Sequence, residues 1–195
     1  MQERTDEKIL DYLKDVEERN NRKSIKDGLT KIIGSYYKFE ARGFIDGKLK
    51  MYIPNIFEEM SEEAKRFKYP SENRPEIIKS NKDGSIAITF KFIDNFLSEE
   101  NVKFITNMAK LMIKRLNPAN IFFDEEVIKV NSKNVGFFDF KSAALDDYLY
   151  NLIFILVFEG KTLMGSFSCP YSEYKEWKEV ALEMIKTIEL TNEDN

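Results

Sequence analysis

The chain contains no histidine among its 195 residues, and Cys169 is its only cysteine. The missing histidines remove the side chain that most often serves as a general base, together with Ser–His and Cys–His nucleophiles and imidazole metal ligands. A single cysteine excludes an intramolecular disulfide, and a lone thiol is typical of a reducing compartment. We therefore expect binding rather than enzymatic catalysis, and no cofactor or metal.

Long apolar runs and excess positive charge are also missing. The longest apolar run, residues 152–158, is far shorter than the roughly 20 residues that span a bilayer, and the first eight residues are charge-dense. With 34 acidic against 30 basic residues the formal net charge is −4, which disfavours phosphate backbones. We expect a cytoplasmic protein with no membrane span and no nucleic-acid partner.

The residues that are abundant favour a sheet. Hydrophobic residues make up 43% of the chain, and sixteen Phe and nine Tyr are suited to pleated, half-buried surfaces. Asp46-Gly47 and Asp83-Gly84 predict tight hairpins, because both positions accept positive φ angles. Glu159-Gly160 is a weaker signal, since only its glycine escapes the steric penalty.

Two strands indicate how the sheet is covered. Within 85–92 the residues Ile86, Ile88, Phe90 and Phe92 face one way and Thr89 and Lys91 the other, whereas residues 152–158 are apolar at every position. The second pattern requires cover on both faces of the sheet. The sequence predicts an α+β fold: a twisted antiparallel sheet of about six to eight strands, covered by helices on both faces, together with an N-terminal helix.

The clearest helix is expected over 98–116. Ser98 can cap it, and a continuous apolar stripe contains Val102, Ile105, Met108, Ala109, Met112, Ile113 and Leu116. A second long helix is expected over 171–188, and a short one begins near Ser61. These helices are expected to cover the sheet.

An amphipathic segment precedes this domain. Residues 5–19 place Ile9, Leu10, Leu13 and Val16 on one helical stripe, and a polar tether follows. We predict an N-terminal amphipathic helix and charged linker over 1–30 and a single α+β sandwich domain over 31–195. Since a fifteen-residue helix is marginal alone, these four side chains are expected to bind the chain's own sheet, a second copy or a partner protein.

Candidate reactive residues are few. Cys169 precedes the second long helix but is expected to be structural, because free cysteines are usually buried. Asn151 lies in the most apolar strand, either as a satisfied amide or at a pocket wall. The apolar neighbours of Asp139 could raise its pKa toward acid–base use, or the side chain points to solvent. No second base is tied to Asp139 by spacing.

Two charged groups are expected to be solvated. Residues 124–126 (Asp-Glu-Glu) could bind a hard cation but lack the pattern of a calcium loop. Lys103, Lys110 and Lys114 lie on one side of the 98–116 helix, as the default solvated face. No glycine loop follows a strand and opens a helix in the way that phosphate binding requires.

Four segments carry a family resemblance, from Phe44 to Pro54, from Arg74 to Ile78, from Gly160 to Cys169 and from Trp177 to Ile188. Together they resemble the Mog1/PsbP-like fold, including the DcrB-related bacterial proteins. The resemblance covers roughly residues 36–190 and leaves the N-terminal segment unexplained. It implies a protein that binds other proteins and carries no family catalytic residue.

The sequence thus favours a non-enzymatic protein-interaction module, a DcrB-like adaptor or chaperone that serves, for example, a bacterial secretion system. Its partner is expected to be another protein or a second copy of the chain. The alternative is a small-ligand binding protein or a carboxylate-based hydrolase with a cavity between sheet and helices. A closed apolar pocket with Asp139 or Asn151 at its wall would favour that alternative.

Overall fold

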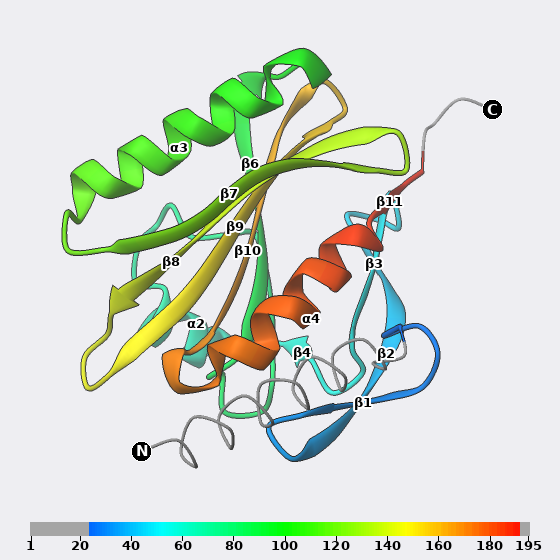
Figure 1. Ribbon diagram of the computed structural model, residues 1–195, viewed down its shortest axis with the longest axis vertical. Helices are drawn as coiled ribbons and strands as arrows, with labels where there is room; N and C mark the ends of the chain where they lie inside the picture. The colour runs from blue at the N-terminus through cyan, green and yellow to red at the C-terminus, as the bar shows by residue number, and fades with distance from the viewer. Residues whose placement is uncertain (1–23, 192–195) are drawn as a thin grey trace, which may run out of the picture.

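Two antiparallel sheets organise the part of the chain that the computed structural model describes, residues 24–191 (Figure 1). The strands are β1 (Leu29–Ile32), β2 (Ser35–Phe44), β3 (Leu49–Pro54), β4 (Glu58–Glu59), β5 (Ile77–Ser80), β6 (Ala87–Phe96), β7 (Ile121–Val130), β8 (Lys133–Ala143), β9 (Tyr148–Phe158), β10 (Lys161–Pro170) and β11 (Glu189–Leu190). The α-helices are α2 (Glu62–Lys68), α3 (Val102–Leu116) and α4 (Tyr174–Lys186). The 3-10 turns η1 (Glu99–Asn101) and η2 (Tyr171–Glu173) lead into α3 and α4. The predicted α+β class is confirmed.

The strand orders are β4-β5-β6-β10-β9-β8-β7 in the larger sheet and β1-β2-β3-β11 in the smaller one. The sequence predicted one sheet of about six to eight strands, whereas the described residues form two sheets, of seven and four strands. The first predicted hairpin, β2–β3, lies outside that sheet and forms the centre of the second one. Its inward side chains Leu49, Met51 and Ile53 are buried in the same cluster as α4, so the hairpin stacks over the larger sheet instead of extending its edge.

Two hairpins close with two-residue turns in which both residues have positive φ angles. Phe158 pairs directly with Lys161, so Glu159-Gly160 is a two-residue turn with φ angles of 49° and 73°. Asn131-Ser132 makes the same kind of turn between β7 and β8, although it lacks a glycine. Positive φ at both central residues matches the right-handed twist of the flanking strands.

Strand β9 separates two hydrophobic cores, as the unbroken apolar run predicts. Leu152, Phe154 and Leu156 belong to the larger core, which also contains β6 side chains, the smaller sheet and α4. Ile153 and Ile155 point the other way and join a smaller core with Phe138 and side chains of α3. We call these the α4 core and the α3 core. In Figure 1 the larger sheet runs between the two helices.

Close approach of α3 to the sheet depends on a glycine in β8. A Cβ atom at Gly136 would overlap the side chain of Thr106, a buried residue of α3. The Thr106 Oγ1 donates a hydrogen bond to the carbonyl oxygen of Val102 at 2.8 Å. Any larger residue would therefore push the helix outward. The position fixes where α3 can lie.

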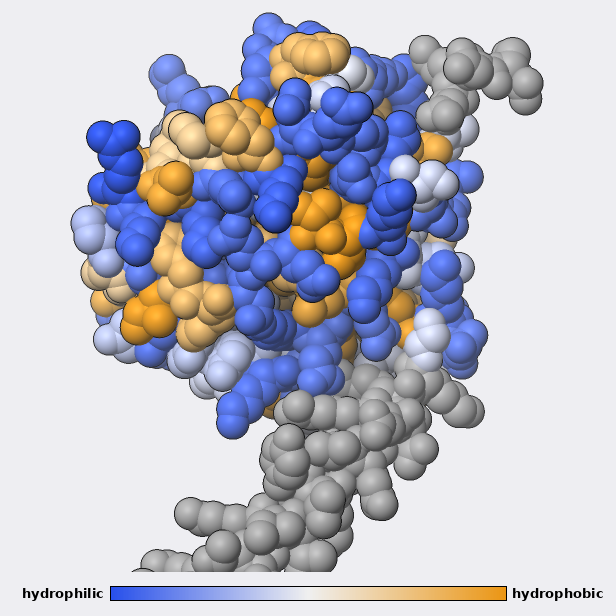
Figure 2. Space-filling view, turned by 45° about the horizontal axis from the view of Figure 1, so that its top comes forward, coloured by the Kyte–Doolittle hydropathy of each residue, from blue (hydrophilic) through white to orange (hydrophobic). Residues whose placement is uncertain are grey.

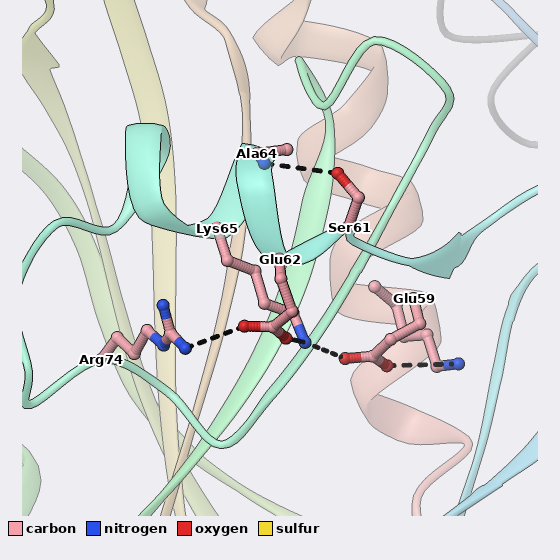
Figure 3. A network of polar contacts seen from close by, with 7 residues as sticks. Glu59, Ser61, Glu62, Ala64, Lys65 and Arg74 are labelled. Atoms are coloured by element: carbon pink, nitrogen blue, oxygen red, sulfur yellow. Dashed lines mark hydrogen bonds and ion pairs between the residues drawn. The ribbon is translucent and has the colours of Figure 1, made fainter.

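The crossover between the two sheets is held by ion pairs around α2 (Figure 3). Ser61 caps the helix by accepting a hydrogen bond from the Ala64 N–H at 3.3 Å, as the sequence suggested for a short helix here. The nearly buried Lys65 donates to Glu59 at 2.7 Å and to Glu62 at 3.1 Å. The hydrogen bond to Glu59 is the main cause that raises the pKa of Lys65, against the opposing effect of burial. The crossover is thereby tied to the β4–β5 edge of the sheet.

The described residues contain no helix with the length and apolarity to cross a bilayer. Ile9, Leu10, Leu13 and Val16, with the predicted N-terminal helix, lie outside the described residues. The chain enters the α4 core at Ile25, which is buried and whose N–H donates to Glu183 of α4 at 3.3 Å.

Candidate protein-binding surface

Asp139 lies at the centre of a buried polar network between β7, β8 and α4. Its carboxylate is completely buried. Its Oδ1 accepts a hydrogen bond from the Asp124 N–H at 2.7 Å, and its Oδ2 accepts from the Tyr150 hydroxyl at 2.9 Å and pairs with Lys178 Nζ at 2.6 Å. The side chain therefore faces the α4 core and not the solvent.

The local register explains how β7 reaches Asp139. Phe122 pairs with Phe140 and Glu125 with Phe138, so two residues of β7, Phe123 and Asp124, oppose Asp139 alone. This is a β-bulge, which leaves a backbone N–H without its ladder partner. Asp139 accepts a hydrogen bond from the Asp124 N–H, so its carboxylate satisfies a backbone donor at the bulge.

The electrostatics of the network favour a charged Lys178 and a neutral Tyr150. Burial lowers the pKa of Lys178, but hydrogen bonds to Asp124 and Asp139 outweigh it and raise that pKa overall. Burial, reinforced by the Asp139 charge, raises the pKa of Tyr150. Each oxygen of Asp139 is already engaged by a protein donor. The arrangement fits a structural anchor better than an acid or base that must exchange protons with a substrate.

The remaining candidates also have internal partners. Cys169 is buried, and burial raises the pKa of its thiol, which opposes reactivity. The Asn151 amide donates to Ser142 Oγ at 2.9 Å, in agreement with the satisfied-amide interpretation.

The acidic run 124–126 is exposed, as expected, but it lies within strand β7 and not in a turn. Asp124 pairs with Lys178 at 2.6 Å, and Glu125 pairs with Lys110 of α3. Lys110 is consequently not part of a purely solvated face. Within residues 24–191, no cluster of three or more acidic or Cys side chains could hold a metal ion.

A cluster of aromatic side chains, which the sequence analysis did not identify, packs at the N-terminal end of α4. Tyr171 and Tyr174 stack with ring centres 4.5 Å apart, and Phe123 from the β7 bulge stacks beside both. Lys141 Nζ lies 3.7 Å from the ring centre of Tyr148 and 4.2 Å from that of Tyr171. These cation–π contacts join the β8–β9 hairpin to the start of α4.

The α3 helix carries the most extended exposed apolar surface on a single helix in the described part of the chain. Five of its side chains are between 46% and 79% exposed: Phe104, Met108, Leu111, Met112 and Leu116. Their spacing of three, four and eight residues places them on one side of the helix. We call this set the α3 outer face. Figure 2 shows tan and orange side chains on the left of the view, where α3 lies.

The sequence prediction placed part of this face inside the protein. Val102, Ile105, Ala109 and Ile113 do pack in the α3 core, but Met108, Met112 and Leu116 are exposed. The prediction fails for these three because the apolar arc of α3 covers roughly 200°, more than a helix can press against one sheet. An angular plot that included Phe104 and Leu111 would have revealed the excess width.

The charge on α3 has one sign. Between Val102 and Leu116 the helix contains Lys103, Lys110, Lys114 and Arg115 and no acidic residue. Lys110 is paired with Glu125, whereas in residues 24–191 no ion pair involves the other three cations. The α3 outer face is thus apolar, with Lys103 and Lys114 beside it and Arg115 within it, and none of these three cations has an ion-pair partner among residues 24–191.

Comparison with known proteins extends only to the fold. No family model and no curated protein matches the chain. A solution structure of cyanobacterial PsbP from Synechocystis aligns with a TM-score of 0.57 at 7% identity, over 78% of this chain and 92% of that one. LpqN, described as involved in cell envelope biogenesis of Mycobacterium tuberculosis, aligns with a TM-score of 0.51 at 10% identity, over 83% and 95%. The described residues therefore have a PsbP-like α+β fold, and at these identities the likeness shows the fold alone.

Proposed function

We propose that this chain is a non-enzymatic, cytoplasmic protein-interaction module, of the DcrB-like adaptor or chaperone type, that binds its partner through the α3 outer face. The observation that carries the proposal is the set of five exposed apolar side chains on one side of a single helix. Soluble proteins seldom expose contiguous apolar patches unless these bind something. Met and Phe are well suited to such a surface because their side chains adapt to a partner.

The geometry also supports a rigid platform beneath this surface. Val102 and Thr106 are buried on the opposite side of α3, and Gly136 lets the helix lie close to β8. A helix fixed in this way presents its outer side chains without having to order on binding, which lowers the entropic cost of association.

The alternative of a ligand binder or hydrolase requires Asp139 or Asn151 at a cavity wall. Asp139 is completely buried, and protein donors already engage both of its oxygens. Asn151 is bonded to Ser142. These contacts favour the interaction module over the alternative.

Site-specific photo-cross-linking tests the proposal. Benzoylphenylalanine replaces Met112, which is 62% exposed on the α3 outer face, or Tyr36, which is 67% exposed on the smaller sheet, as the matched control. The full chain is expressed in its native cells and irradiated, and adducts are identified by mass spectrometry. We expect a protein adduct, either a second copy or another protein, at position 112 and none at position 36.

Absence of any protein adduct at position 112 would overturn the proposal, and so would equal labelling at both positions. The control is close in exposure and apolar character, so a difference between the two reports the location of binding and not mere accessibility.

A further inference from the structure

We infer that the occupant of the α3 outer face is the N-terminal segment, residues 5–19, of a second copy of this chain. The inference rests on the proposed function, because it names the partner for that same surface. The segment lies outside the described residues, and its pattern is known from the sequence. Three independent features match it to α3: charge, length and tether.

Charge is complementary between the two elements. Residues 5–19 contain six acidic side chains and three basic ones, whereas α3 contains four basic side chains and no acidic one. The cations at Lys103, Lys114 and Arg115 have no ion-pair partner within residues 24–191. An acidic helix placed on the outer face would supply those partners at the rim of the contact, where charge sets orientation and partner choice.

Length and apolar pattern also agree. Residues 5–19 and α3 are each fifteen residues long, which corresponds to about 22 Å of helix. Ile9, Leu10, Leu13 and Val16 would form one stripe on the segment, and the α3 outer face offers an apolar stripe of similar extent. Two amphipathic helices that pack side by side would bury both stripes.

The tether determines that the occupant comes from a second copy. Ile25 is fixed in the α4 core by burial and by its N–H bond to Glu183, on the opposite side of the sheet from α3. Six Cα–Cα steps separate Arg19 from Ile25, so these two residues lie at most about 21 Å apart when the chain is extended. A helix on the α3 outer face would lie one layer beyond α3, about 30 Å from the α4 layer, at roughly 10 Å for each helix–sheet and helix–helix layer. The chain's own segment therefore cannot lie along its own α3 outer face.

Reciprocal exchange is the simplest closed arrangement. The segment of each copy binds α3 of the other, and the two equal contacts are related by twofold symmetry. Once one segment has bound, the second contact forms at a high effective concentration. The expected species is a dimer.

Sedimentation velocity of the full chain at several concentrations measures this dimer. Leu13→Lys puts a charge into the segment's apolar stripe and is expected to raise the dimer dissociation constant about 30-fold or more, as at an interface hot spot. Leu111→Lys on α3 is expected to act equally. Tyr36→Lys, on the exposed surface of the smaller sheet, is the control and should leave the constant unchanged.

A charge-exchange experiment tests the pairing itself. One variant carries glutamates at Lys103, Lys114 and Arg115, and a second carries lysines at Asp11, Asp15 and Glu18. Each variant alone is expected to be monomeric, because like charges then face each other. Mixed in equal amounts they are expected to form a heterodimer, since each segment again faces an α3 of opposite charge. Far-UV circular dichroism shows that both variants remain folded.

The outcomes separate this inference from the proposed function. A wild-type chain that stays monomeric at about 100 µM, or a mixture that forms no heterodimer, overturns the inference. If the cross-link at position 112 then captures a different protein, the proposed function stands with another partner. If the wild-type monomer instead sediments with phosphatidylserine vesicles and Leu111→Lys abolishes this, both proposals are overturned in favour of a membrane surface.

Discussion

The two long helices of this protein are both amphipathic but have different surroundings. The α4 helix buries Trp177, Val180, Ala181, Met184 and Ile185. The α3 helix is two residues longer and equally amphipathic, yet only Val102 and Thr106 are fully buried. One helix is enclosed between two sheets, whereas the other covers one face of one sheet. The comparison indicates that α4 holds the fold together and that α3 has apolar surface left for binding.

The largest loss of stability is expected when the Trp177 side chain of α4 is truncated. Its side chain is completely buried, and it contacts the rings of Phe167 and Tyr37, with ring centres 5.6 and 5.1 Å away. Trp177→Ala is expected to lower the free energy of unfolding by about 4 kcal/mol, because a large cavity replaces the ring. Urea denaturation measures the effect. A loss below about 1 kcal/mol would show that α4 is not the anchor described here.

A somewhat smaller loss is expected from breaking the polar network beneath α4. Lys178→Met leaves the buried Asp139 carboxylate without its cation and should cost about 3 kcal/mol of unfolding free energy at pH 7. Lys175→Met, three residues earlier and exposed, is the matched control and should change stability by less than about 0.5 kcal/mol. Equal effects of the two substitutions would contradict the role assigned to the network.

Alkaline pH should lower the free energy of unfolding through Tyr150, which packs in the α4 core. Its pKa is raised above the ordinary value of 10.0, so its contribution to stability is complete below pH 10 and is lost progressively as the pH rises above 10. Tyr150→Phe should flatten the decline in unfolding free energy between pH 9.5 and 11 by up to about 1.4 kcal/mol per pH unit. Identical slopes in the two proteins would argue against the buried phenol.

The smallest expected effect on stability is at the α3 outer face. Leu111→Ala should change the unfolding free energy by less than about 0.5 kcal/mol at a concentration where the chain is monomeric, because the side chain is 54% exposed. Thermal unfolding and urea denaturation provide the measurement. A loss of about 2 kcal/mol or more would mean that Leu111 belongs to the core. It would contradict the distinction between a buried α4 and an α3 with exposed apolar surface.

Much of the sheet could be predicted from residue patterns. Ile86, Ile88 and Phe90 face the α4 core as their alternation requires, and the unbroken run of β9 does lie between two cores. Such patterns are local, because strand neighbours point to opposite faces whatever else surrounds them. The division into two sheets could not be predicted, since it depends on where the β2–β3 hairpin packs.

The candidate site was less predictable. The sequence marked Asp139 for its apolar neighbours but could not show that Tyr150 and Lys178, distant along the chain, would meet it. It marked Lys103, Lys110 and Lys114 as one solvated set, although Lys110 pairs with Glu125 of β7. The wide apolar arc of α3 could be read from the sequence, but which part of it stays exposed, Met112 included, depends on how the helix lies on the sheet, which no local pattern records. The N-terminal stripe and the domain boundaries stay predictions.

The bulge at Phe123 and Asp124 also affects how copies of the protein can meet. Strand β7 is the last in its sheet, and an unpaired outer strand offers its N–H and C=O groups to any other strand that approaches. The extra residue bends this edge strand, and Glu126 and Lys129 add exposed charge along it. Uncontrolled sheet-to-sheet polymerisation is thereby discouraged, so a crowded solution of this protein should resist forming amyloid-like fibres.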